Sequence, residues 1–121
     1  MNSPEENEVQ QEINFEDFLR VDIRVGTIIE VYLNSKAKKE AYILEIDFGK
    51  NLGIKKSSAQ IVTNYTPEEL LKTQVLSVIN FPPKRVAGVK SEVLVLAVVN
   101  ETKGTILIRP SQKCENGSRV F

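Results

Sequence analysis

The chain has 121 residues, with sixteen Lys and Arg balanced by sixteen Asp and Glu, so its formal net charge is zero. It has no His and a single cysteine, Cys114, which excludes Ser-His-Asp and Cys-His chemistry, nearly all zinc sites and an internal disulfide. It also lacks the glycine-rich phosphate-binding motifs of nucleotide enzymes and any apolar run of about 20 residues that could span a bilayer. We therefore expect a single cytoplasmic domain that is not an enzyme, needs no metal or cofactor and does not insert into a membrane.

The N-terminal segment, residues 1–13, is predicted to be a disordered acidic tail. It has no basic residue and four acids, Glu5, Glu6, Glu8 and Glu12. A polar, acidic composition without apolar periodicity cannot bury enough surface to fold. Without those acids, residues 14–121 keep sixteen bases against twelve acids. We predict that this mildly basic remainder forms the folded domain.

A short helix is predicted next, over residues 15–19. Asn14 is placed to cap it, and acidic residues fill its first turn, where they complement the helix dipole. Phe15, Phe18 and Leu19 share one face of this helix. Because a helix of one or two turns is not stable alone, the face must dock, either in the seam of a dimer or on the open end of the domain itself.

The remaining elements are mostly strands. Runs of β-branched residues with alternating polarity, bounded by turn signals, predict strands over residues 21–33, 41–48, 54 onward, 75–81, 92–99 and 105–109. Gly26 is expected to mark a bulge or bend in the first strand. Thr66, followed by Pro67, predicts a short capped helix between the third and fourth strands.

This order of elements predicts an all-β fold, namely a five-stranded OB-fold barrel with short helices, an N-terminal helix and a C-terminal extension. OB-folds bind ligands on the face of strands 2 and 3 and through the loops joining strands 1–2 and 4–5. Both loops are basic here, with Lys36, Lys38 and Lys39 in the first and Lys84, Arg85 and Lys90 in the second. Such loops indicate an anionic ligand, but they are equally typical of loops that are simply soluble, and charge alone leaves both readings open.

Four stretches carry a family resemblance: IDFG at residues 46–49, SSAQI at 57–61, YTPEEL at 65–70 and NFPPKRVAGVKSEVLVL at 80–96. They resemble the tRNA-binding OB-domain family, which includes free-standing tRNA-binding proteins and the C-terminal appendix of methionyl-tRNA synthetases. Synthetase-type domains have a Ser-Glx-Gly-Met-Leu-Leu run where residues 91–96 of this chain read Ser-Glu-Val-Leu-Val-Leu. They also have a Pro-Arg-Gln-Ile type of run where residues 55–61 of this chain read Lys-Lys-Ser-Ser-Ala-Gln-Ile. In both departures the chain is similar to the CsaA-type branch of small export-related chaperones.

The resemblance implies a homodimer that binds unfolded or precursor polypeptides and assists protein export. The alternative is a free-standing, structure-selective tRNA-binding protein. The residues expected to bind RNA are Lys36, Lys38, Lys39, Lys55, Lys56, Lys84, Arg85 and Lys90. Those expected to bind peptide are Ser57, Ser58, Gln60, Phe81, Pro82 and Ser91. The expected dimer interface is Phe15, Phe18 and Leu19.

Two of the loop residues have a further expected role. Ser91 and Glu92 should orient the second basic loop through internal hydrogen bonds, since a carboxylate such as Glu92 would repel RNA. The small polar residues Ser57, Ser58 and Gln60 could likewise hydrogen-bond a bound chain or complete local turns, and the sequence leaves these two roles open.

Overall fold

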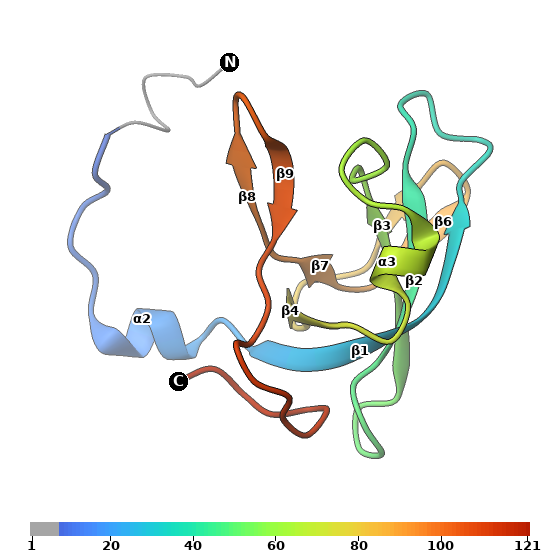
Figure 1. Cartoon of the computed structure of the whole chain (residues 1–121). Helices are drawn as coiled ribbons and strands as arrows, with labels where there is room; N and C mark the ends of the chain where they lie inside the picture. The colour runs from blue at the N-terminus through green and yellow to red at the C-terminus, as the bar shows by residue number, and fades with distance from the viewer. Residues whose placement is uncertain (1–7) are drawn as a thin grey trace.

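Five antiparallel strands form a nearly closed barrel in the computed structural model, which describes residues 8–121 (Figure 1). The strands are β1 (Ile23–Leu33), β2 (Tyr42–Asp47), β3 (Ile54–Ala59), β4 (Gln74–Val78) and β7 (Leu94–Val95), in the spatial order β3-β2-β1-β4-β7. The two ends of this sheet meet where β3 contacts β7. The predicted all-β OB-fold barrel is thereby confirmed.

Two short helices and two hairpins complete the domain. Helix α2 (Phe15–Leu19) precedes β1, and α3 (Pro67–Leu70) lies between β3 and β4, as predicted. Strand β5 (Lys84–Val86) pairs with β6 (Val89–Ser91), and β8 (Ala97–Asn100) pairs with β9 (Gly104–Leu107). The β8–β9 hairpin is a separate two-stranded sheet on the side of α2 (Figure 1), and it is tied to the loop before α3, since Thr105 N donates to Asn64 Oδ1 at 3.3 Å and Leu107 N donates to Tyr65 Oη at 3.0 Å. Within residues 8–121 no helix is long and apolar enough to cross a membrane.

The hydrophobic core lies inside the barrel. Ile28, Leu44, Ile46 and Val75 come from β1, β2 and β4 and are fully buried, and Leu70 of α3 belongs to the same cluster. Burying one such side chain contributes about 1.5–3 kcal/mol. Helix α3 is too short to be stable alone, so the burial of Leu70 is what holds it on the barrel.

Gly26 has a different role from the one predicted. The irregularity in β1 falls between Ile28 and Glu30, not at Gly26. A Cβ at Gly26 would lie 2.5 Å from Cγ2 of Ile46 and 2.8 Å from the ring of Phe48. The glycine is therefore needed because the core side chains of Ile46 in β2 and of Phe48 just after it pack directly against the backbone of β1.

The predicted strand over residues 92–99 is interrupted at Leu96. Its backbone N–H donates to Leu76 O at 2.9 Å, and its carbonyl accepts from Ile108 N at 3.1 Å. Before Leu96 the chain pairs with β4, and after it the chain pairs with β9. One predicted strand is thus two, because the chain passes from the barrel into a separate hairpin at this residue.

The predicted loop over residues 81–91 contains a hairpin of its own. Val86 pairs with Val89, which leaves Ala87 and Gly88 as a two-residue turn with φ angles of 48° and 84°. Positive φ at both positions defines a type I′ turn, whose twist matches that of the strands it joins. The chain thus reverses at Ala87 and Gly88, and the strands β5 and β6 on either side were not predicted.

Helix α3 begins with the predicted cap. Thr66 Oγ1 accepts from Glu69 N at 3.3 Å, and the Glu69 carboxylate accepts from Thr66 N at 3.0 Å and from Thr66 Oγ1 at 3.1 Å. These bonds from Thr66, helped by the charge of Arg109, hold the pKa of Glu69 below its usual range.

The N-terminal segment is described only from residue 8. Residues 8–13 have no regular secondary structure and are exposed, and the disorder predicted for residues 1–7 lies outside the described residues. In α2, Asn14 N donates to Asp17 Oδ2 at 3.2 Å. The division of the chain into a tail and a domain at residue 14 stays a prediction.

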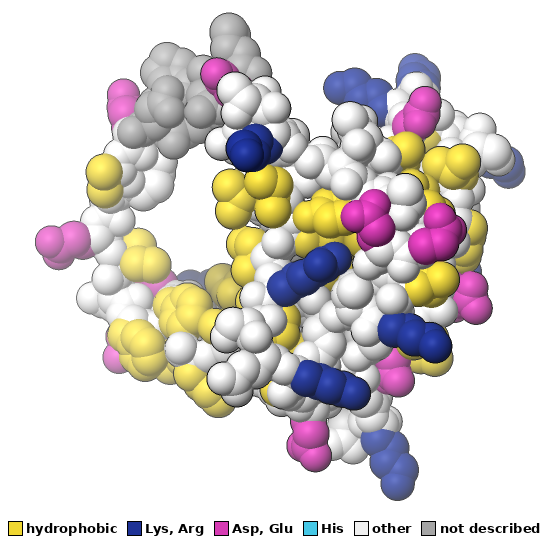
Figure 2. All heavy atoms as spheres, in the orientation of Figure 1, with side chains coloured by type: hydrophobic (Ala, Val, Ile, Leu, Met, Phe, Trp, Pro, Cys, Tyr) yellow, Lys and Arg dark blue, Asp and Glu magenta, His cyan; other side chains and the backbone are white. Residues whose placement is uncertain are grey.

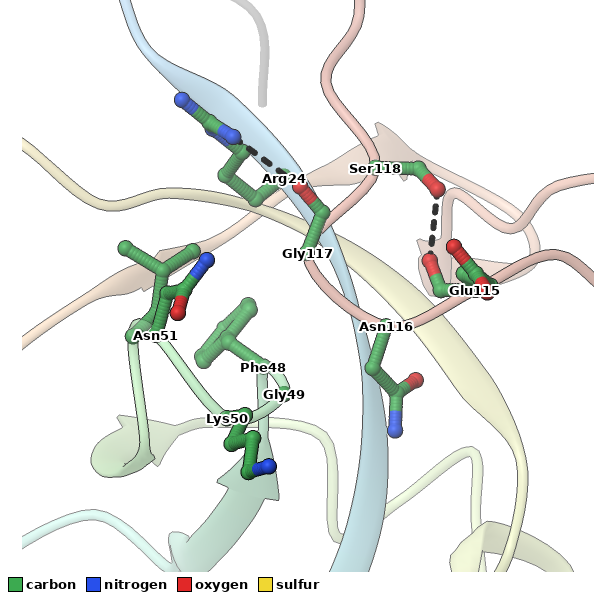
Figure 3. Close-up of a pocket in the computed structure, with 10 residues that line it drawn as sticks. Arg24, Phe48, Gly49, Lys50, Asn51, Glu115, Asn116, Gly117 and Ser118 are labelled. Atoms are coloured by element: carbon green, nitrogen blue, oxygen red, sulfur yellow. Dashed lines mark hydrogen bonds between the residues drawn. The ribbon is translucent and has the colours of Figure 1, made fainter.

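The C-terminal extension docks along the barrel. Gly117 N donates to Val25 O at 2.7 Å, and Val120 N donates to Ile23 O at 2.9 Å. A polar hollow of about 700 Å³ lies at the seam between Gly117 and the backbone of Phe48 and Gly49, and Figure 3 shows the residues that line it. A Cβ on Gly117, whose φ is 91°, would lie 2.7 Å from Phe48 O. The close backbone approach at this seam requires a glycine.

Glu92 closes the barrel at the edge of β3 that β2 does not cover. Glu92 N donates to Lys56 O at 2.8 Å, and Lys56 N donates to the Glu92 carboxylate at 3.1 Å. The second carboxylate oxygen lies 3.9 Å from Lys55 Nζ. Glu92 thus supplies the hydrogen bonds that a neighbouring strand would make to Lys56, in agreement with the internal hydrogen bonds expected for this residue.

We predict that Glu92→Ala lowers the free energy of unfolding by about 1 kcal/mol, because the Lys56 N–H loses a charged acceptor at a partly solvated site. Glu92→Gln keeps an oxygen for that hydrogen bond and should cost about half as much, since charge-assisted bonds are roughly twice as strong as neutral ones. Urea unfolding at one protein concentration measures both changes. Equal stability of the three proteins would contradict a closing role for Glu92.

Candidate functional site

The β5–β6 hairpin is fixed to the barrel from two sides. Ser91 Oγ accepts from Ser58 N of β3 at 3.0 Å, and Val86 O accepts from the Asn34 side chain at 3.5 Å. Asn34 is buried and begins the loop between β1 and β2. The hairpin, which belongs to the second loop predicted to bind ligands, is therefore fastened both to β3 and to the first such loop, and its position relative to β3 is defined.

The two faces of the hairpin differ in chemistry. Arg85 lies directly opposite Lys90, so the two cations share one face of the pleated ribbon. The guanidinium donates to Gly88 O at 3.3 Å. Like charges in directly opposite positions destabilise a strand pair. An anion bound beside this face would relieve that repulsion.

The other face of the hairpin borders an apolar hollow of about 340 Å³. Its lining is Ser58, Phe81, Pro82, Lys84, Val86, Ser91, Glu92, Val93 and Leu94. Phe81 is 52% exposed and Leu94 is 50% exposed, while Val93 is buried. The proline-rich turn presents the Phe81 ring here, since Pro82 and Pro83 prevent strand pairing. Two large apolar side chains thus flank a concave site that is open to a ligand.

A second hollow, about 510 Å³, lies on the other side of Ser58 and Val86, which line both hollows. It is bordered by the loop cations Lys36, Lys38 and Lys39 and by Gln60. We call the two hollows, together with the cationic face of the hairpin, the hairpin surface. It combines an apolar site with a cationic margin.

The structure brings most of the predicted RNA-binding residues to this surface. Lys36, Lys38 and Lys39 line the second hollow, Lys84 lines the apolar hollow, and Arg85 and Lys90 form the cationic face. Lys56 is exposed on β3, and Lys55 is directed toward Glu92. Neither of these two lysines lines a hollow of the hairpin surface. Whether any of the eight binds RNA stays a prediction.

The predicted peptide-binding residues divide in the same way. Ser58, Phe81, Pro82 and Ser91 line the apolar hollow, and Gln60 lines the second one. Ser57 is 1% exposed and in the single chain offers no surface to a ligand. Leu94 was not among the predicted peptide-binding residues, because the alternating run after Ser91 indicated only that it lies in a strand.

The predicted dimer-interface residues all lie on α2. Phe15 is 64% exposed, whereas Phe18 and Leu19 are half-buried by the chain itself. The two phenylalanine rings lie 6.1 Å apart, centroid to centroid. Of this face, Phe15 is thus the residue that the folded chain leaves uncovered, and the interface stays a prediction.

No arrangement of three or more His, Cys, Asp or Glu side chains that could hold a metal ion occurs within residues 8–121. The chemistry available at the hairpin surface is therefore that of apolar contact, positive charge and hydrogen bonding from Ser58, Ser91 and Gln60. These groups can bind a ligand.

Comparison with known proteins agrees with this arrangement. Residues 23–119 match the tRNA_bind family, described as "Putative tRNA binding domain". The methionine–tRNA ligase of Porphyromonas gingivalis is 35% identical over 112 residues, which are 93% of this chain and 16% of the ligase. The chain thus spans less than a fifth of that relative.

Two solved structures are similar over nearly the whole chain. The chaperone CsaA from Bacillus anthracis is 49% identical, with a TM-score of 0.85, over 92% of this chain and 100% of that one. The CsaA chaperone protein from Picrophilus torridus is 44% identical, with a TM-score of 0.85, over 91% of this chain and 100% of that one. This chain belongs to the tRNA-binding OB-domain family and is a CsaA-type member of it.

Proposed function

We propose that this protein is a chaperone that holds unfolded or precursor polypeptides at the hairpin surface, without an enzymatic reaction. The observation that carries the proposal is the apolar hollow with the half-exposed side chains of Phe81 and Leu94. An apolar site of this kind needs only an exposed hydrophobic side chain on its ligand. Unfolded chains expose many such side chains, whereas folded proteins rarely do. The similarity to CsaA chaperones supports the same function.

The expected affinity of one hollow is modest. Fully burying one large apolar side chain contributes about 1.5–3 kcal/mol, which is too little for stable binding by itself. A long client that reaches several such sites gains through effective concentration. The cations along the margin, such as Lys84 and Lys38, would add attraction for acidic groups next to the apolar residue.

A role in protein export and a cytoplasmic location form part of the same proposal. They rest on the resemblance to the CsaA-type branch, and the single cysteine suits a reducing compartment. A client held before translocation has to stay unfolded, so weak and reversible apolar contacts fit the task better than tight binding.

We predict that Phe81→Ser and Leu94→Ser weaken client binding roughly 5–30-fold, the effect of losing about 1–2 kcal/mol of apolar burial. The measurement is suppression of aggregation of a denatured test enzyme without ATP, at low and high salt. Ile54→Ser is the matched control, because Ile54 is 55% exposed at the opposite end of β3. Apolar capture should persist at high salt. Equal protection by all three variants would contradict the proposed site.

We further propose that two copies of the chain associate through the side that carries α2 and the β8–β9 hairpin. Val98 and Val99 are adjacent in β8, so they point to opposite faces, yet they are 54% and 72% exposed. Figure 2 shows hydrophobic side chains gathered along this hairpin and around α2. A two-fold dimer would bury the same patch on both copies.

Light scattering should therefore return twice the chain mass of 13.6 kDa. Val99→Glu should shift the mass toward one chain, because a dimer would have to bury the new carboxylate. Ile54→Glu places the same charge on an exposed strand residue away from the patch and should leave the mass unchanged. A wild-type protein that stays monomeric at high concentration would contradict the dimer.

The second candidate function is tRNA binding, favoured by the opposed cations Arg85 and Lys90 and by the family. We predict that Arg85→Ala with Lys90→Ala weakens binding of different tRNAs to a similar degree. Each lost phosphate contact should reduce the slope of log K against log salt by roughly 0.7–0.9. Lys50→Ala with Lys103→Ala, on two turns outside the hairpin surface, is the control. An unchanged slope in the Arg85/Lys90 variant would mean that these cations do not contact phosphate.

A further inference from the structure

A basic cleft lies apart from the hairpin surface. It has a volume of about 560 Å³ and separates the turn between α3 and β4 from the chain that follows β9. It shares no residue with either hollow of the hairpin surface. Lys72 borders it on one side, and Arg109 and Lys113 border it on the other. Among the described residues that line it, none is acidic.

The two sides of the cleft are held at a fixed separation. Gln74 at the start of β4 donates its side-chain N–H to Cys114 O at 2.6 Å and accepts from Cys114 N at 3.1 Å. The same side chain donates to Asn116 Oδ1 at 3.2 Å. This two-way amide contact fastens the C-terminal segment to the barrel directly beside Lys113. The backbone on both sides of the cleft is therefore held in place by the fold.

Arg109 is oriented but not neutralised. Its guanidinium lies 5.6 Å from the centre of the Tyr65 ring and donates to Thr73 Oγ1 at 3.5 Å. No ion pair joins Arg109, Lys72 or Lys113 to a carboxylate within residues 8–121. Glu69 is near enough for Arg109 to affect its pKa, but its carboxylate already accepts hydrogen bonds from Thr66.

Lys72 has an unusual backbone conformation. Its φ is 68°, in the left-handed region that glycine and asparagine adopt at lower cost. The backbone is held there because Lys72 N donates to Ile28 O at 2.8 Å and Ile28 N donates to Thr73 O at 2.9 Å. Strained residues of this kind cluster at binding sites. Glycine would fit the backbone at position 72 better, but it would not supply the ammonium group that Lys72 brings to the cleft.

We propose that this cleft binds phosphate groups. Arg109 offers the planar donor pair that suits a phosphate, and the lysines add two point charges. The side chains of Ser111 and Gln112, which also line the cleft, supply neutral donors. A cleft of this size is larger than one phosphate, so it suits a diphosphate or two neighbouring phosphates of an RNA backbone. The inference does not depend on client binding at the hairpin surface.

The first test is a titration with inorganic pyrophosphate, followed through backbone amide NMR shifts at constant ionic strength with chloride as the reference. We expect saturable changes at residues 72–74 and 111–113. Lys72→Asn with Lys113→Ala should weaken binding about tenfold, the loss of two charged contacts. Asparagine tolerates positive φ, so the fold is kept. Lys50→Ala with Lys103→Ala removes the same charge elsewhere and should bind as the wild type does.

The second test repeats the titration with tRNA in the Arg85→Ala, Lys90→Ala background, which removes the cationic face of the hairpin. Changes in the cleft with pyrophosphate alone would identify a small phosphate compound as the ligand. Changes with tRNA alone would identify the RNA backbone, and changes with both would identify phosphate from either source. The proposal is overturned if neither probe shifts the cleft amides, or if the Lys72/Lys113 variant responds as the control does. Because Arg85 and Lys90 are absent in this second test, its failure is distinct from a failure of tRNA binding at the cationic face of the hairpin.

Discussion

The edge of β3 is the constraint on which the rest of the structure depends. The barrel has only a two-residue fifth strand, β7, and this strand pairs with β4. β3 would expose backbone donors and acceptors along its length if nothing covered it. Glu92 and Ser91 supply what a strand would have supplied, bonding to Lys56 and Ser58. The same contacts hold the β5–β6 hairpin in place, so barrel closure and the shape of the hairpin surface have one physical origin.

The short fifth strand also explains where the apolar surface lies. Because the chain leaves the barrel at Leu96, the residues after it form a separate hairpin, in which Val98 and Val99 of β8 are exposed. Before that point, Leu94 sits at the end of the sheet and is half exposed for the same reason. A full-length fifth strand would have carried these side chains along the barrel. The proposed function assigns a partner to the apolar hollow and to the β8–β9 hairpin. Both surfaces thus exist because the chain leaves the five-stranded sheet at Leu96, after only two residues of β7.

Local signals were sufficient to predict much of this fold. The caps at Asn14 and Thr66 depend on residues within one turn, and both helices start where they were expected. The strand pattern is likewise local, and the order of the strands alone places the basic residues of the two loops at the mouth of an OB-fold. The reversal at Gly88 needs only a residue that adopts positive φ, so it too could be predicted from the sequence.

Features that depend on distant contacts could not be predicted. Gly26 is required by side chains about twenty positions away in β2, which is why a bulge was expected there and the real irregularity was missed. The basic cleft exists because the side chain of Gln74 binds the backbone of Cys114, forty positions further along the chain. No sequence pattern around either residue predicts this contact. Ser57 looked like a surface residue because it is polar, but the register of β3 turns it into the barrel.

Although the formal net charge of the chain is zero, several of its acidic residues have internal hydrogen-bonding roles. Several carboxylates accept internal backbone hydrogen bonds: Glu69 and Asp17 in helix caps, Asp47 in the turn after β2, and Glu92 in barrel closure. Each of these carboxylates thus has a structural role in the backbone next to it. Exposed cations such as Lys38 carry no comparable internal role. A chain with a net charge of zero can therefore present two cationic surfaces, because carboxylates such as Asp47 and Glu69 hold the backbone outside those surfaces while the lysines of the loops stay exposed.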